Sequence, residues 1–149
     1  MIHHRTHQLG AGFLLLLLVG ATSALSAADD HGHGHGHGHG HGANIELKPA
    51  SAGVYTVSAT VEGPAAAGKD WHIELVIAPA QPAPKAVRLW VGSEDGKGSA
   101  KSKAGASKAP AGAYHAHADI PNPLPAESAL WVAIESTDGT VVTAKLALP

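Results

Sequence analysis

Cysteine is absent from this chain of 149 residues, and its only methionine is Met1. The chain can therefore form no disulfide bond, and downstream of residue 1 it offers no thiolate or thioether to a soft ion such as Cu(I). Aromatic residues contribute only 4% of the sequence and charged residues 15%. The formal net charge is −2 with neutral histidines, which argues against a nucleic acid or an anionic membrane surface as the partner.

Recognisable catalytic motifs are also missing. There is no cysteine nucleophile, no G-x-S-x-G turn and no glycine-rich phosphate loop between a strand and a helix. The acidic residues are scattered and form no evident pair. We therefore expect a protein that is not an enzyme and that holds no organic cofactor.

The first 28 residues have the order of a secretory signal peptide. Arg5 precedes the apolar run LGAGFLLLLLV, and the small and polar residues GATSALSAADD follow it. The apolar run is shorter than the roughly 20 residues that span a bilayer. We expect cleavage after Ala27 or Ala28, a periplasmic or secreted protein, and no stable membrane insertion after cleavage. Removal of Arg5 moves the net charge from −2 to −3.

Residues 29–43 contain the most unusual feature of the sequence, the repeat HGHGHGHGHGHG at 31–42. Imidazole is a common ligand of Zn(II), Ni(II) and Cu(II), and alternating glycines leave the backbone free to wrap around an ion. The pattern predicts a disordered tail that captures or buffers such ions in many interchangeable geometries. Because a proton competes for each ligand, affinity should fall below about pH 6. The predicted ligands are His31, His33, His35, His37, His39 and His41.

Whether the tail contains a second kind of metal site depends on where the signal peptide is cleaved. Cleavage after Ala28 would leave Asp29-Asp30-His31 at the new N-terminus. A free amine, two amides and an imidazole in third position can surround Cu(II) or Ni(II) in a square plane. Cleavage one residue earlier moves His31 to fourth place and removes this chelate.

The remaining residues, 44–149, form runs in which apolar and polar side chains alternate. This period-2 pattern, interrupted by proline and glycine, predicts an all-β antiparallel sandwich of six to seven strands. Asp138-Gly139 between two such runs predicts a hairpin. Residues 93–112 contain four lysines and no large apolar side chain, so we expect a flexible Lys/Gly/Ala loop there. The predicted strands cover residues 45–47, 54–62, 71–78, 86–92, 113–120, 129–136 and 140–148.

Three histidines fall in the predicted strands. His115 and His117 are two residues apart and therefore project from the same face, and His72 lies on the polar face of another strand. If the two strands share a sheet, His72, His115 and His117 could form a metal site in the domain. The alternative is that these side chains are simply solvated.

The three tryptophans divide between the two faces of their strands. Trp71 lies with the aliphatic residues, so we expect it in the core. Trp90 and Trp131 lie opposite the aliphatic residues, where each could form an exposed contact surface or cover a sheet edge. They support a second hypothesis, in which the domain is a structural or protein-interaction module and the histidine repeat is only a linker.

Residues 71–136 resemble small periplasmic immunoglobulin-like domains of the YtkA or FixH type. The resemblance lies in WHIELVIAP, VRLWVG, GAYHAHADIP and LWVAIES, with a variable loop between the second and third segments. It implies an immunoglobulin-like sandwich and an association with metal transport or copper-oxidase assembly. A metal transporter or another envelope protein would then be the partner. Domains of this type often carry methionine ligands, which this chain lacks.

Overall fold

The computed structural model describes residues 42–149. The predicted signal peptide, Asp29, Asp30 and the six histidines of the repeat lie outside the described residues. Within them there is no helix, and therefore none that could cross a membrane. The strands are β1 (Asn44–Ala52), β2 (Tyr55–Glu62), β3 (Asp70–Ala78), β4 (Ala86–Gly92), β5 (Ser102–Lys103), β6 (Gly105–Ala106), β7 (Ala113–Asp119), β8 (Ala129–Glu135) and β9 (Val141–Ala147).

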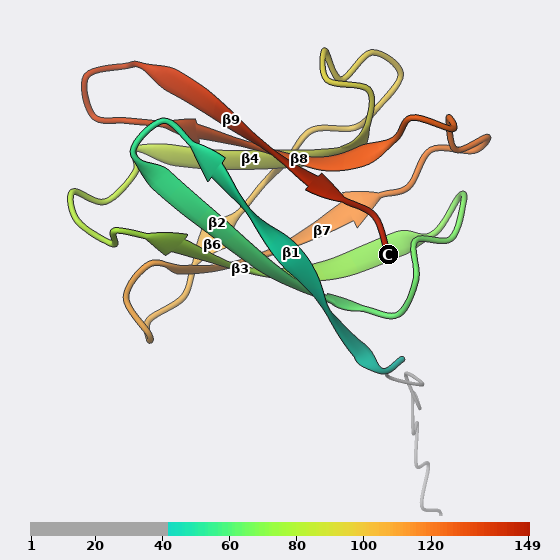
Figure 1. Cartoon of the computed structure of the whole chain (residues 1–149), viewed down its shortest axis with the longest axis horizontal. Coiled ribbons are helices and arrows are strands. Elements are labelled where there is room, and N and C mark those ends of the chain that lie inside the picture. The colour runs from blue at the N-terminus through green and yellow to red at the C-terminus, as the bar shows by residue number, and fades with distance from the viewer. Residues whose placement is uncertain (1–41) are drawn as a thin grey trace, which may run out of the picture. The chain divides into compact units, whose positions relative to one another are not determined.

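These strands form two antiparallel sheets, which Figure 1 shows as two layers. Sheet I has the order β1-β2-β3-β7-β6, and sheet II has the order β5-β4-β8-β9. Apart from β1, these orders correspond to strands A-B-E-D and C′-C-F-G of an immunoglobulin-like sandwich. The predicted fold class is therefore confirmed, with β1 added at the edge of sheet I.

Alternation of side chains along each strand produces the two-layer arrangement. In β3, Trp71, Ile73, Leu75 and Ile77 are all buried, whereas the residues between them are exposed or half-buried. One face of each strand is therefore removed from water, as the period of two requires. The expectation that Trp71 belongs to the core is confirmed.

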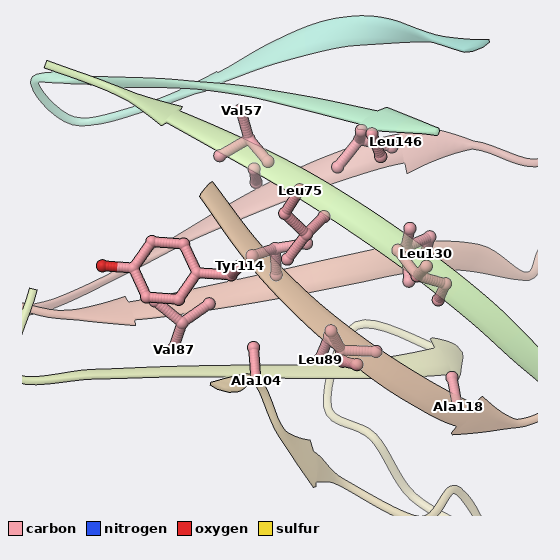
Figure 2. Close-up of a cluster of buried hydrophobic side chains, with 14 of the residues drawn as sticks. Val57, Leu75, Val87, Leu89, Ala104, Tyr114, Ala118, Leu130 and Leu146 are labelled. Carbon is pink, nitrogen blue, oxygen red and sulfur yellow. The ribbon is translucent and has the colours of Figure 1, made fainter. Parts of the chain in front are cut away.

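The main core lies between the two sheets and is almost entirely aliphatic. Figure 2 shows side chains of both sheets in one cluster, with Leu75 and Tyr114 from sheet I and Leu89 and Leu130 from sheet II. No polar or charged residue among 42–149 is buried. The polar chemistry of the described domain is therefore confined to its outer faces, edges and loops.

The hairpin predicted at Asp138-Gly139 is present between β8 and β9. Glu135 pairs with Val141, and the backbone N–H of Ser136 donates to the carbonyl of Thr140 at 2.9 Å. Gly139 has a φ of 87°, a conformation that glycine adopts without steric cost. Asp138 accepts a hydrogen bond from the backbone N–H of Thr140, which closes the turn.

Two segments contain more strand than the sequence predicts. β1 extends to Ala52 through a bulge, in which Lys48 and Pro49 stand opposite a single residue of β2. Residues 93–112, expected as one long loop, contain the two-residue strands β5 and β6. Between them the buried Ala104 marks the point where the chain crosses from sheet II to sheet I.

Candidate functional site

The outer face of sheet I brings two of the three domain histidines directly opposite each other. In the antiparallel register of β3 and β7, His72 pairs with His117 and Glu74 pairs with His115. Directly opposed side chains on one face are the closest neighbours that a sheet provides. The ring centroids of His72 and His117 lie 5.1 Å apart, with the planes tilted by 41°.

A carboxylate contacts the Nδ1 atom of each of these two rings. Nδ1 of His117 lies 2.6 Å from an oxygen of Asp70, and Nδ1 of His72 lies 3.3 Å from an oxygen of Glu62. All four side chains keep access to solvent, with exposed fractions of 31% for His72, 34% for Glu62, 61% for His117 and 57% for Asp70. These four residues, named here the imidazole–carboxylate row, occupy strands β2, β3 and β7.

Trp71 fixes the backbone at one end of this row. Its buried indole N–H lies 3.1 Å from the carbonyl oxygen of Gly63 and 3.2 Å from that of Glu62. Trp71 directly precedes His72 in β3. Its side chain points into the core and that of His72 points to the surface, but both contact the end of β2 at Glu62. The Glu62–His72 contact therefore rests on a backbone that the core holds in place.

His115 does not join the row. Its ring lies over Gly105 of β6, where an added Cβ would lie 3.0 Å from the ring Cε1 atom, and its Nδ1 is 3.5 Å from the hydroxyl of Ser107. The structure therefore brings together two of the predicted residues, His72 and His117, and directs the third to the neighbouring strand. No group of three or more His, Cys, Asp or Glu residues that could hold a metal ion occurs within residues 42–149.

The chain enters the sandwich beside the row. The carbonyl of Ala43 accepts a hydrogen bond of 3.0 Å from the N–H of Gly63, and Asn44 pairs with Glu62. A small pocket next to this point is lined by Asn44, Thr60, Val61, Glu62, His72 and Glu74. The covalent link to the histidine repeat, which ends at Gly42, therefore lies next to Glu62.

The outer face of sheet II carries the other predicted surface residues, Trp90 and Trp131. They are directly opposed across β4 and β8, and their rings are stacked with centroids 6.5 Å apart. Their exposed fractions are only 4% and 7%, so neither ring forms an exposed contact surface. Each indole N–H is also satisfied at 2.8 Å, in Trp90 by the carbonyl of Ser93 and in Trp131 by that of Gly92.

Lysine side chains lie over this tryptophan pair, one from the lysine-rich segment and one from β9. The ammonium group of Lys101 lies 4.4 Å from the centre of a Trp90 ring, and that of Lys145 lies 5.4 Å from a Trp131 ring. Asp95 accepts hydrogen bonds from the Ser93 hydroxyl at 2.7 Å and from the Lys97 backbone N–H at 2.9 Å. These two hydrogen bonds lower the pKa of Asp95 below its ordinary value of 3.8, and the bond from Lys97 has the larger effect.

Glu62 and Asp70 are the site residues that the sequence reasoning missed. Asp70 could have been found, because it lies two residues before His72 in β3 and therefore on the same face. Glu62 carries no such signal. It reaches His72 only through the register of β2 with β3, which the sequence does not determine.

Comparison of the chain with models of protein families, with curated proteins and with solved structures finds no match. The residues of this chain and their geometry are therefore the basis for a proposed function.

Proposed function

We propose that this chain is an exported, non-enzymatic metal-binding protein that captures or buffers a divalent transition ion, Zn(II), Ni(II) or Cu(II). The observation that carries the proposal is the repeat at 31–42, six imidazoles alternating with six glycines next to the folded domain. Several of these nitrogen donors can close around one ion without a prearranged site. The cost is the conformational entropy of ordering the segment, which favours moderate affinity and exchange of the ion.

The sandwich then serves as the carrier of the tail. Its described surface adds further imidazole and carboxylate groups on sheet I, beside the point where the tail is attached. The resemblance of residues 71–136 to YtkA and FixH domains supports a metal transporter or another envelope protein as the recipient of the ion. The predicted signal peptide supports a periplasmic or secreted location.

Titration of the native chain and of a tail variant tests the proposal. In the variant, all six repeat histidines are replaced by serine, which keeps the length of the tail and its glycines. Calorimetry at neutral pH with Zn(II), Ni(II) and Cu(II) should show saturable binding to the native chain and loss of most bound ions in the variant. Equal stoichiometry and affinity in both proteins would contradict a role of the tail as the metal store.

The square-planar site at Asp29-Asp30-His31 has its own test. Mass measurement of the exported protein gives its first residue. A chain that begins at Asp29 should give the visible absorption band of a square-planar Cu(II) complex, and His31→Ser should abolish this band. A chain that begins at Ala28 should lack the band from the outset.

A further inference from the structure

We propose that His72 and His117 form a fixed metal site in the domain, which binds one divalent first-row ion through the Nε2 atoms of both rings. For the supply of the ion, this inference rests on the proposed function of the tail. The remaining coordination positions are left to water or to another donor. The site differs from the tail in kind, because its two ligands are placed by the fold and backed by carboxylates.

The separation of the two rings fits a shared ion. Metal–nitrogen bonds of about 2.0–2.1 Å at a tetrahedral angle place the centres of two imidazole rings about 5 Å apart. The centroids of His72 and His117 are separated by 5.1 Å. The centroid separation is therefore that of two imidazoles on one ion, with β3 and β7 in the register that the structure has.

The carboxylates determine which nitrogen is available. An ionised carboxylate only accepts hydrogen bonds, so Nδ1 of His117 must donate to Asp70 and Nδ1 of His72 must donate to Glu62. A neutral imidazole with its proton on Nδ1 carries its lone pair on Nε2. Metal-binding histidines in proteins commonly have such a carboxylate behind them, which orients the ring and raises its basicity.

Backbone rigidity favours this pair over any pair within the tail. β3 is hydrogen-bonded on both sides, to β2 and to β7, and the Trp71 indole holds the end of β2. The two ligands therefore lose little conformational freedom when an ion binds, whereas the glycine-rich repeat must be ordered. Two imidazoles of the tail should consequently bind an ion more weakly than His72 and His117 do.

Covalent attachment keeps the source of the ion close to the pair. Only Gly42 and Ala43 separate His41 from β1, whose first residue Asn44 pairs with Glu62. A covalent link of only two residues gives an effective concentration on the order of millimolar. The exposed fractions of 31% for His72 and 61% for His117 leave the rings accessible to the incoming ion.

The test uses the full-length chain with the nine histidines ahead of the domain replaced by serine, which leaves His72, His115 and His117. Zn(II) should bind this variant with one ion per chain in calorimetry. Nitrogen NMR of the imidazoles should show a metal-induced shift of Nε2 in His72 and His117 and none in His115. His72→Ala or His117→Ala should weaken binding at least about tenfold, whereas the matched control His115→Ala should not.

A second pair of variants tests the role of the carboxylates. Asp70→Asn removes the negative charge behind His117 and should weaken Zn(II) binding about 10- to 100-fold. Asp119→Asn is the matched control, because it removes the same charge from the residue directly opposite Asp70. Thermal unfolding of each metal-free variant verifies that the domain remains folded.

The outcomes separate this site from the function of the tail. If the native chain binds Zn(II) but the nine-serine variant does not, the domain site is overturned and the tail proposal stands. Saturable binding that His115→Ala weakens as much as His72→Ala would also overturn the site. If the nine-serine variant binds as many ions as the native chain, the domain site stands and the tail proposal fails.

Discussion

The outer faces of the two sheets follow the same alternation of side chains but differ in their exposure to solvent. On sheet I, the outward positions of β3 and β7 include all three domain histidines and three acids, and His117 and Asp70 remain more than half exposed. On sheet II, the directly opposed outward residues Trp90 and Trp131 are almost completely buried. Polar side chains can stay in contact with water, whereas a stacked pair of indoles needs a cover.

The lysine-rich segment supplies that cover for Trp90 without large apolar residues of its own. It uses the carbonyl of Ser93 for the Trp90 indole N–H and the ammonium group of Lys101 for the ring, whereas Lys145 of β9 lies over Trp131. Sheet II is therefore closed to ligands at this point, and sheet I presents its polar groups to solvent. The difference locates the chemistry of the described domain on sheet I.

Alanine substitution on each face should give the largest contrast in stability. Trp131→Ala removes a buried ring from its stacked partner and should lower the free energy of unfolding by about 3–5 kcal/mol. His117→Ala removes a side chain that is largely in water and should change it by no more than about 0.5 kcal/mol without metal. Urea unfolding followed by circular dichroism measures both values, and similar losses would contradict the contrast.

A smaller loss of stability should come from substitution of two glycines in the lysine-rich segment beside Trp90. Gly96 and Gly98 have φ values of 68° and 76°, so alanine at either position should cost about 1–2 kcal/mol. An added Cβ at Gly96 also clashes with the side chain of Lys101, whereas nothing lies within 4 Å of one at Gly98. Gly96→Ala should therefore displace Lys101 and expose Trp90.

Acrylamide quenching of tryptophan fluorescence distinguishes these two glycine variants. Quenching should increase in Gly96→Ala and remain at the native level in Gly98→Ala, although both proteins lose similar stability. Equal quenching in the two variants would show that Lys101 does not shield Trp90.

The smallest effect should come from acid. The hydrogen bonds to Asp95 lower its pKa in the folded state, so its contribution to stability is complete above the unfolded value of 3.8. That contribution is lost as the pH falls below about 4 through the lowered folded value. Unfolding midpoints measured from pH 6 to pH 2.5 should fall less steeply for Asp95→Ala than for the native chain.

Much of the fold follows from local patterns in the sequence. The alternation of apolar and polar residues predicted seven strands, because the inner face of each strand must be apolar. Asp138-Gly139 predicted a hairpin, because glycine tolerates positive φ. Trp71 was assigned to the core from its position in the same alternation. β5 and β6 escaped prediction because strands of two residues show no period, and their pairing depends on where the chain crosses between the sheets.

The candidate site was less predictable because it depends on register. The sequence placed His115 and His117 on one face but could not show that His117, and not His115, faces His72. A shift of two residues would have paired His115 with His72. Glu62 joins the row only through the alignment of β2 with β3, and the burial of Trp90 depends on a segment whose composition suggested a solvated loop.

The bulge in β1 has a consequence for loading with metal. If the tail binds metal as proposed, imidazoles from different chains can share an ion, so a metal-rich solution would gather many copies of the protein together. Such crowding would bring edge strands of different copies together, and β1 lies at one end of sheet I. Lys48 and Pro49 break the regular edge of β1, one with a charge and the other without an N–H to donate. The edge is thereby a poor template for another chain, and ion-bridged clusters should dissolve when the metal is removed.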